Sequence, residues 1–135
     1  MRVFLDANVL FSAAAPESAT RRLLNAILTH ASAVVNRHVW EEATRNVAAK
    51  RPVLLSGLRE LERRLEFASR FSRAGLSSLP EKDQPVIRGA TGSRCTHLWT
   101  SDRRHFGAYY GQTIQGTRIV SSVMLADELI SKGWL

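Results

Sequence analysis

Residues 3–8 read Val-Phe-Leu-Asp-Ala-Asn, a short apolar run that stops abruptly at a polar loop. A run of this length, bounded by polar residues, indicates a buried central strand. Residues 33–35, 97–100 and 117–120 have the same character, and stretches with helical spacing of apolar residues lie between them. This alternation predicts an α/β domain with a central, mainly parallel sheet of four or five strands and right-handed crossovers.

The helices are located by capping residues and apolar periodicity. Ser18 is placed to cap a helix after the first strand, and residues 39–47 repeat at helical spacing after the second. The clearest amphipathic stripe predicts one helix over residues 52–68, and a shorter helix is expected over 83–92. The exposed face of the longer helix carries two acid and base pairs at four-residue spacing, Glu60 with Arg64 and Glu66 with Arg70.

Length and composition limit the class of protein. The chain has 135 residues, 44% of them apolar, which suits one packed domain over residues 1–135. No apolar stretch is long enough to span a membrane and the first residues do not resemble a secretory signal, which predicts a cytoplasmic protein with no membrane partner. The single cysteine, Cys95, excludes an internal disulfide and a zinc site built on several cysteines.

The charge balance points to a polyanionic partner. Lysine and arginine total 19 against 12 acidic residues, which gives a formal net charge of +7, and most of these cations are arginine. Nucleic acid is the first expectation, because the planar guanidinium group binds phosphate bidentately. An arginine-rich genome would raise the count without any binding role, and composition alone does not separate the two explanations.

Three aspartates stand where a predicted strand ends or a predicted helix begins: Asp6, Asp83 and Asp102. Ligands gather at the carboxyl ends of strands in open α/β sheets, and clustered carboxylates favour a divalent cation such as Mg²⁺ or Mn²⁺. Alternatives remain for two of them, because Asp83 is placed to cap the following helix and Asp102 to pair with Arg103 or Arg104. For Asp6 a functional role is the favoured explanation, because burying a carboxylate beside a buried strand costs free energy unless the group has a partner.

A fourth acid is expected on the helix after the second strand. Glu41 and Glu42 are adjacent there and point about 100° apart, so only one of them faces inward. Glu42 lies on the flank of the apolar stripe and is therefore the candidate, whereas Glu41 lies toward solvent. The alternative is a solvated pair of glutamates, or one bonded to Arg37 or Arg45.

Four stretches, in this order and spacing, resemble the PIN-domain ribonuclease family: LDANVLFSA (5–13), VWEEATRNV (39–47), DQPVIRGA (83–90) and LWTSDRRHFG (98–107). The resemblance runs nearly end to end, and its first and last stretches are fairly specific as a pair. It implies a three-layer α/β/α PIN-like (Rossmannoid) domain whose acids bind divalent metal and hydrolyse RNA. It further implies the toxin component of a bacterial toxin-antitoxin pair, with a cognate antitoxin as partner.

The resemblance also assigns roles to individual residues. It gives the catalytic and metal-binding positions to the four acids already selected: Asp6, Glu42, Asp83 and Asp102. It gives Asn8 and Thr100 supporting roles. Where many relatives carry another carboxylate, this chain has Arg103, Arg104 and His105, and we expect the two arginines to bind nucleic acid and the histidine to be packed or exposed rather than ligating.

The sequence therefore predicts a metal-dependent endoribonuclease that uses a metal-activated water, with Mg²⁺ or Mn²⁺ as cofactor. RNA is the expected substrate, and a homodimer is a further possible assembly. One alternative keeps the fold as a non-catalytic RNA-binding or protein-interaction module. Another makes Asp6 a phosphoacceptor, although Asn8 stands where phosphatases that begin in this way need a second aspartate.

Overall fold

A computed structural model describes residues 1–135 and contains one six-stranded sheet in the order β3-β2-β1-β4-β6-β5. All neighbouring strands are parallel except β5, which is antiparallel to β6. The strands are β1 (Arg2–Leu5), β2 (Ser32–Val35), β3 (Glu66–Phe67), β4 (His97–Trp99), β5 (Thr113–Ile114) and β6 (Thr117–Val120). The predicted α/β architecture with a mainly parallel sheet is confirmed.

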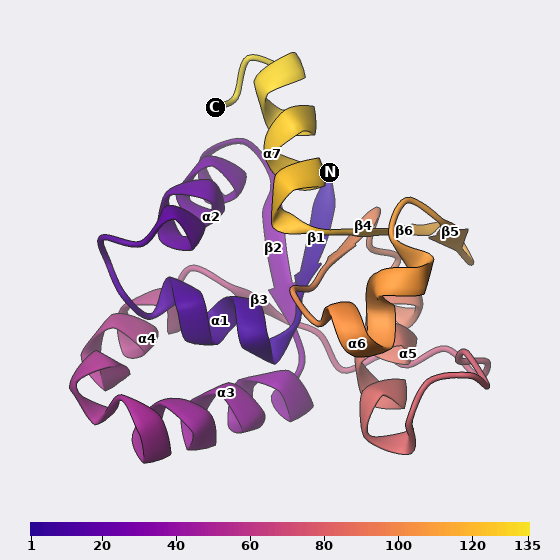
Figure 1. Cartoon of the computed structure of the whole chain (residues 1–135), viewed down its shortest axis with the longest axis horizontal. Helices are drawn as coiled ribbons and strands as arrows, with labels where there is room; N and C mark the ends of the chain where they lie inside the picture. The colour runs from indigo at the N-terminus through magenta and orange to yellow at the C-terminus, as the bar shows by residue number, and fades with distance from the viewer.

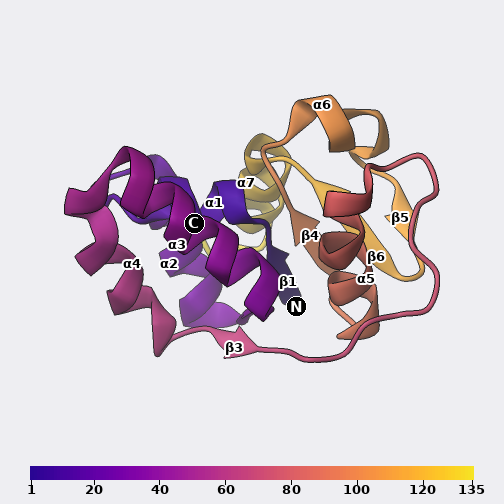
Figure 2. The same ribbon diagram turned by 90° about the horizontal axis from the view of Figure 1, so that it is seen from below.

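Helices cover both faces of the sheet, with α2 and α7 on one face and α5 on the other (Figures 1 and 2). The α-helices are α1 (Ala7–Ala13), α2 (Ala19–His30), α3 (Arg37–Lys50), α4 (Leu55–Glu62), α5 (Gln84–Gly92), α6 (Arg103–Phe106) and α7 (Ser122–Ser131). Short 3-10 turns are η1 (Pro52–Leu54), η2 (Glu81–Asp83) and η3 (Gly107–Tyr109). None of the helices has the length and apolar character needed to cross a membrane.

The core is one continuous cluster of 32 buried apolar residues. β1 lies near the middle of the sheet, where Val3, Phe4 and Leu5 are fully buried. Unbroken apolar runs are typical of parallel strands that are covered on both faces. Trp99 on the neighbouring strand β4 is also fully buried, and its indole N–H donates to the hydroxyl of Ser122 at 2.9 Å.

The sheet has six strands rather than the predicted four or five, and the two that the apolar runs did not locate are the edge strands β3 and β5. β3 and β5 each contain only two residues, and neither consists of a buried apolar run. Their positions come from backbone pairing with β2 and β6, respectively. Strands this short are typical of protected sheet edges, and periodicity does not detect them.

The helix predicted over residues 52–68 is wrong in its second half. The chain forms η1 and then α4, which ends at Glu62, and residues 66–67 pair with β2 as a strand. Leu58 and Leu61 still reach the core, so the first part of the amphipathic stripe is correct. Beyond Glu62 the chain leaves the helix, because its backbone forms hydrogen bonds with the edge of β2 instead of another helical turn. One of these bonds joins Ala68 N–H to Val35 O at 2.8 Å.

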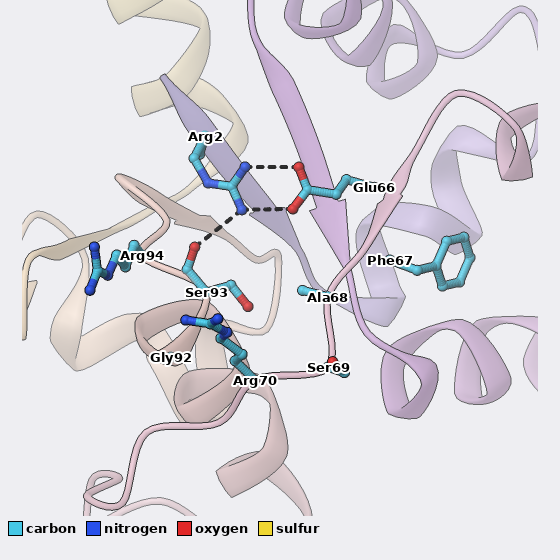
Figure 3. Close-up of a pocket in the computed structure, with 9 residues that line it drawn as sticks. All are labelled: Arg2, Glu66, Phe67, Ala68, Ser69, Arg70, Gly92, Ser93 and Arg94. Carbon is cyan, nitrogen blue, oxygen red and sulfur yellow. Dashed lines mark hydrogen bonds and ion pairs between the residues drawn. The ribbon is translucent and has the colours of Figure 1, made fainter.

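The predicted ion pairs on that helix do not form. Glu66 binds Arg2 through two parallel hydrogen bonds of 2.8 Å each (Figure 3). Glu60 lies 3.5 Å from a guanidinium nitrogen of Arg21, and Arg64 donates to the side chain of Asn25. Both glutamates therefore pair with residues distant in sequence, because the chain turns away after α4.

Arg21 joins the end of α1 to α4 from a buried position. The residue is 3% exposed, and its side chain donates to the carbonyl oxygens of Ala13 at 2.7 Å and Gly57 at 2.8 Å. α4 approaches α1 so closely that a Cβ added at Gly57 would lie 2.0 Å from the carbonyl oxygen of Ala14. This contact orients the helices that flank the carboxyl end of β1.

Candidate active site

Asp6 follows β1 directly and is held in place by three donors. It is the N-cap of α1, and its side chain is 4% exposed. One carboxylate oxygen accepts from the backbone N–H of Ala7 at 2.8 Å. The other accepts from the Thr100 hydroxyl at 2.7 Å and the Asn8 amide at 3.2 Å. The carboxylate therefore has one orientation, fixed by Ala7, by Asn8 and by Thr100, which directly follows β4.

Asn8 and Thr100 connect the ends of β1 and β4. The Asn8 side-chain oxygen accepts from the backbone N–H of Ser101 at 2.9 Å. The Thr100 hydroxyl accepts from the backbone N–H of Asp102 at 3.1 Å, while it donates to Asp6. The two side chains thus orient both strand-end acids, and their supporting role in catalysis stays a prediction.

Asp83 and Asp102 reach the same region from η2 and from the end of β4. Asp83 is 8% exposed and makes no capping bond to the helix that follows. The capping explanation for this residue is therefore excluded. Asp102 caps the short helix α6 by accepting from the backbone N–H of His105 at 3.1 Å, and it forms no ion pair with Arg103 or Arg104.

The two glutamates of α3 separate as the helical period predicts. Glu41 is exposed and lies 3.6 Å from a guanidinium nitrogen of Arg37. Glu42 is half-buried and lines a cavity together with Asp6. The choice of Glu42 as the inward-facing acid agrees with the structure.

All four selected acids line one cavity of about 330 Å³ at the carboxyl ends of β1 and β4. Figure 1 shows α1, α3 and α6 close to the lower end of β1, where the cavity lies. The remaining lining residues are Asn8, Phe11, Ser12, Asn46, Lys50, Lys82 and Ser101. The fold therefore gathers carboxylates from four separate segments of the chain.

The cations of this cavity are Lys50 and Lys82, which the sequence analysis did not select. Glu42, Asn46 and Lys50 stand at four-residue intervals on α3, so one helix face carries all three into the cavity. That spacing was the available signal. Arg103 and Arg104 are exposed beside the site and do not line the cavity, and their role in binding nucleic acid stays a prediction.

Burial of negative charge dominates the electrostatics of the cavity. Burial raises the pKa of Asp6 to about 6, against the hydrogen bond from Thr100, and the nearby carboxylate of Glu42 adds to the rise. Burial also raises the pKa of Asp83, while the charge of His105 and then that of Lys82 oppose it. These carboxylates are costly to ionise together, as expected for groups that hold a cation.

His105 is the residue that sequence reasoning underestimated. Its Nδ1 atom lies 2.9 Å from an Asp83 oxygen and 3.0 Å from an Asp102 oxygen. Neither His105 Nδ1 nor that Asp83 oxygen makes a well-directed hydrogen bond, although both are buried. His105 Nδ1 and the Asp83 and Asp102 oxygens are therefore close enough together to bind one cation.

The donor set fits a divalent metal. Asp83, Asp102 and His105 each offer one donor atom, and the three atoms lie within 4.8 Å of one another. Asp6 and Glu42 line the same cavity but do not belong to this close cluster. Oxygen donors suit Mg²⁺ and Mn²⁺, and one imidazole shifts the preference toward Mn²⁺.

The layers, the parallel sheet and the acidic cavity at the strand ends define a three-layer α/β/α, PIN-like fold. No family model and no curated protein matches the chain. Among solved structures, the chain is similar to one chain in the crystal structure of VapBC2 from Rickettsia felis bound to a DNA fragment from their promoter. The TM-score is 0.65 at 16% identity, and the match covers 90% of this chain and 98% of that chain. This likeness confirms the predicted fold.

Proposed function

We propose that this protein is a metal-dependent endoribonuclease whose cavity holds one or two Mg²⁺ or Mn²⁺ ions. The observation that carries the proposal is the convergence of carboxylates from four separate segments on one cavity: Asp6, Glu42, Asp83 and Asp102. Burying this much negative charge is unfavourable unless a cation lies among the groups. A net charge of +7 on a chain with an acidic cavity further supports a polyanionic substrate.

A divalent ion held there would lower the pKa of a bound water and offset charge on the scissile phosphate. The chain's own residues supply position and charge. Thr100 and Asn8 hold Asp6 in one orientation, so that its carboxylate faces the cavity without rearrangement. Lys50 and Lys82 place two cations on the cavity wall, where they attract the phosphates that flank the cleaved bond.

The proposal includes a partner protein that controls the nuclease. The structural neighbour is a VapBC2 assembly bound to promoter DNA, and we extend this organisation to the present chain as the toxin of a cytoplasmic toxin-antitoxin pair. Co-expression with the product of the adjacent gene should inhibit RNA cleavage and yield a stable complex. Cleavage that is unaffected by every adjacent gene product would remove this part of the proposal.

The decisive experiment measures Mn²⁺ binding by calorimetry and cleavage of single-stranded RNA in the same preparations. The four test variants are Asp6→Asn, Glu42→Gln, Asp83→Asn and Asp102→Asn. Glu41→Gln is the matched control, because it removes the adjacent, exposed carboxylate of the same helix. Each test variant should weaken Mn²⁺ binding by about tenfold or more and reduce cleavage, whereas the control should change neither.

Two results would contradict this function. A folded wild-type protein that binds RNA in a salt-sensitive manner, with neither Mn²⁺ binding nor cleavage, would identify a non-catalytic RNA-binding module. Full cleavage by a folded Asp6→Asn protein would remove the cavity from the reaction. Phosphorylation of Asp6 is not favoured, because Asn8 stands where phosphatases that begin in this way need a second aspartate.

A further inference from the structure

A second polar cavity, also of about 330 Å³, lies at the opposite end of β1 from the acidic one (Figure 3). It is lined by Arg2, Glu66, Phe67, Ala68, Ser69, Arg70, Gly92, Ser93 and Arg94. β1 and α5 each connect the two cavities, with Arg2 and Asp6 at the two ends of β1. Four steps along a strand give a separation of about 13 Å, and ten steps along α5 give about 15 Å. The second cavity is therefore distinct from the acidic site.

This second cavity carries uncompensated positive charge. Arg2 is fixed by its two bonds of 2.8 Å to Glu66, so this pair is electrically neutral. Arg70 and Arg94 are exposed and form no ion pair or side-chain hydrogen bond with the protein. Two free guanidinium groups on one cavity wall favour an anion, and guanidinium geometry is suited to phosphate oxygens.

Ser93 supplies an independent sign of a missing ligand. The residue is 9% exposed, and its hydroxyl has no hydrogen-bond partner. Figure 3 shows Arg2 above Ser93, Arg70 below it and Arg94 to its left. A buried hydroxyl is normally paired, so an unpaired one in the wall of a cavity lined by arginines indicates a missing hydrogen-bond partner.

The backbone at Arg94 gives a third observation. Arg94 has a φ of 55°, in the left-handed region, directly after the end of α5. The N–H of Arg94 bonds to Thr91 O at 3.1 Å and that of Cys95 to Ala90 O at 3.0 Å. This is the helix ending in which glycine is the usual residue at the left-handed position. Arg94 therefore occupies a backbone position that glycine would adopt without strain.

Hydrogen bonds within the protein satisfy several carbonyl groups at the carboxyl end of α5. The two backbone bonds at Arg94 and Cys95 already satisfy carbonyl groups of the last turn. Arg2 donates to the carbonyl oxygen of Ser93 at 3.1 Å, which satisfies one more carbonyl group at the helix end. These carbonyl oxygens are therefore already hydrogen-bonded within the protein.

We propose that this second cavity binds a phosphate group, with Arg70 and Arg94 pairing to its oxygens and Ser93 donating one hydrogen bond. The phosphate is either a free anion or the 5′-terminal monoester of an RNA chain, which present the same oxygens to these residues. The proposal stands apart from the ribonuclease function, because none of its residues lines the acidic cavity.

The test uses the full chain in metal-free buffer, so that no cleavage occurs. Inorganic phosphate is titrated by calorimetry, and two short RNAs of one sequence, bearing a 5′ phosphate or a 5′ hydroxyl, are compared by fluorescence anisotropy. The variants are Arg94→Gly and Arg70→Gln. Arg73→Gln is the matched control, because it removes an exposed arginine of the same segment that does not line the cavity.

We expect both test variants to raise the dissociation constant for phosphate by about tenfold or more, the loss of one charge-assisted hydrogen bond. Arg73→Gln should leave it unchanged. Arg94→Gly should keep or raise the urea midpoint of unfolding, because glycine relieves the left-handed backbone. A preference for the 5′-phosphorylated RNA that Arg94→Gly abolishes identifies the RNA end as the source, and phosphate binding without that preference identifies the free anion.

Three results would overturn the proposal. The first is a wild-type protein that binds neither inorganic phosphate nor the 5′ phosphate. The second is an equal loss of affinity in Arg73→Gln, which would mean that diffuse positive charge is responsible. The third is an Arg94→Gly protein with a lower urea midpoint and unchanged phosphate affinity, which would mean that Arg94 serves the fold.

Discussion

Replacing Asp6 by asparagine should stabilise the metal-free protein at neutral pH and destabilise it slightly in acid. Burial raises the pKa of Asp6 from its ordinary value of 3.8 to about 6. A raised carboxyl pKa means that the folded state holds the proton more tightly than the unfolded state. Stability is therefore lost as pH rises from about 4 to above 6, and the loss is complete at pH 7.5.

The size of the effect follows from this pKa difference. About two pKa units at about 1.4 kcal/mol each correspond to about 3 kcal/mol of destabilisation in the ionised state. Asparagine avoids this cost but does not accept all three hydrogen bonds that the carboxylate accepts, which costs about 1 kcal/mol at every pH. The variant should thus be about 2 kcal/mol more stable at pH 7.5 and about 1 kcal/mol less stable near pH 4.

Urea unfolding in EDTA at pH 4 and pH 7.5 measures both differences. Addition of Mn²⁺ in place of EDTA provides the second arm, because a ligand at about 100 times its dissociation constant stabilises the folded state by about 2.7 kcal/mol. Mn²⁺ should stabilise the wild type by this amount and the variant by much less. The ionised carboxylate would then be unfavourable only when no cation is present.

A constant difference between wild type and Asp6→Asn across this pH range would refute the electrostatic reasoning. It would mean that the carboxyl group titrates at its ordinary pKa in the folded protein, so that burial does not destabilise its charged form. Equal stabilisation of both proteins by Mn²⁺ would separately show that the Asp6 carboxylate does not contribute to Mn²⁺ binding.

Further predictions concern packing and substrate binding. Arg21→Met should lower the free energy of unfolding by about 2 to 4 kcal/mol, because it leaves two buried carbonyl groups unpaired, whereas Arg22→Met on the exposed side should change it little in the same urea assay. Gly57→Ala should cost about 1 to 3 kcal/mol, because the new methyl group would collide with the backbone carbonyl of Ala14, directly after α1; an unchanged melting temperature would refute the tight contact. Lys50→Ala should weaken RNA binding in metal-free buffer and reduce its salt dependence, while Lys132→Ala, outside the acidic cavity, should not.

The parts of the fold that depend on neighbouring residues were predictable. Ser18 caps α2 by accepting from the backbone N–H of Arg21 at 3.1 Å, as its position before an apolar repeat indicated. Asp6 and Asp102 were selected because they follow buried strands, and the parallel pairing of β1 with β4 brings both strand ends to one edge of the sheet. Glu42 was separated from Glu41 by the helical period alone.

Other features depend on contacts between residues far apart in the chain. The sequence did not predict where α4 ends, because the cause is two contacts with distant residues. Glu66 forms an ion pair with Arg2, 64 positions earlier in the chain. The edge of β2 also pairs with residues that helix propensity alone would assign to a helix. His105 was undervalued because a single histidine beside an aromatic residue carries no signal. Its place in the candidate site follows from the distance of 2.9 Å between its Nδ1 atom and an oxygen of Asp83, which lies on a different segment of the chain.

By itself, the amino-acid sequence determined which segments become buried strands, where their capping and strand-end residues stand, and therefore which acids are candidates for a metal. These features follow from interactions within a few residues, whose geometry is set by the helix and strand periods. Only the tertiary structure decided which cations share the acidic cavity, that His105 meets Asp83, and that Arg94 and Ser93 line a second one. Such encounters depend on how distant segments pack, and no local pattern encodes them.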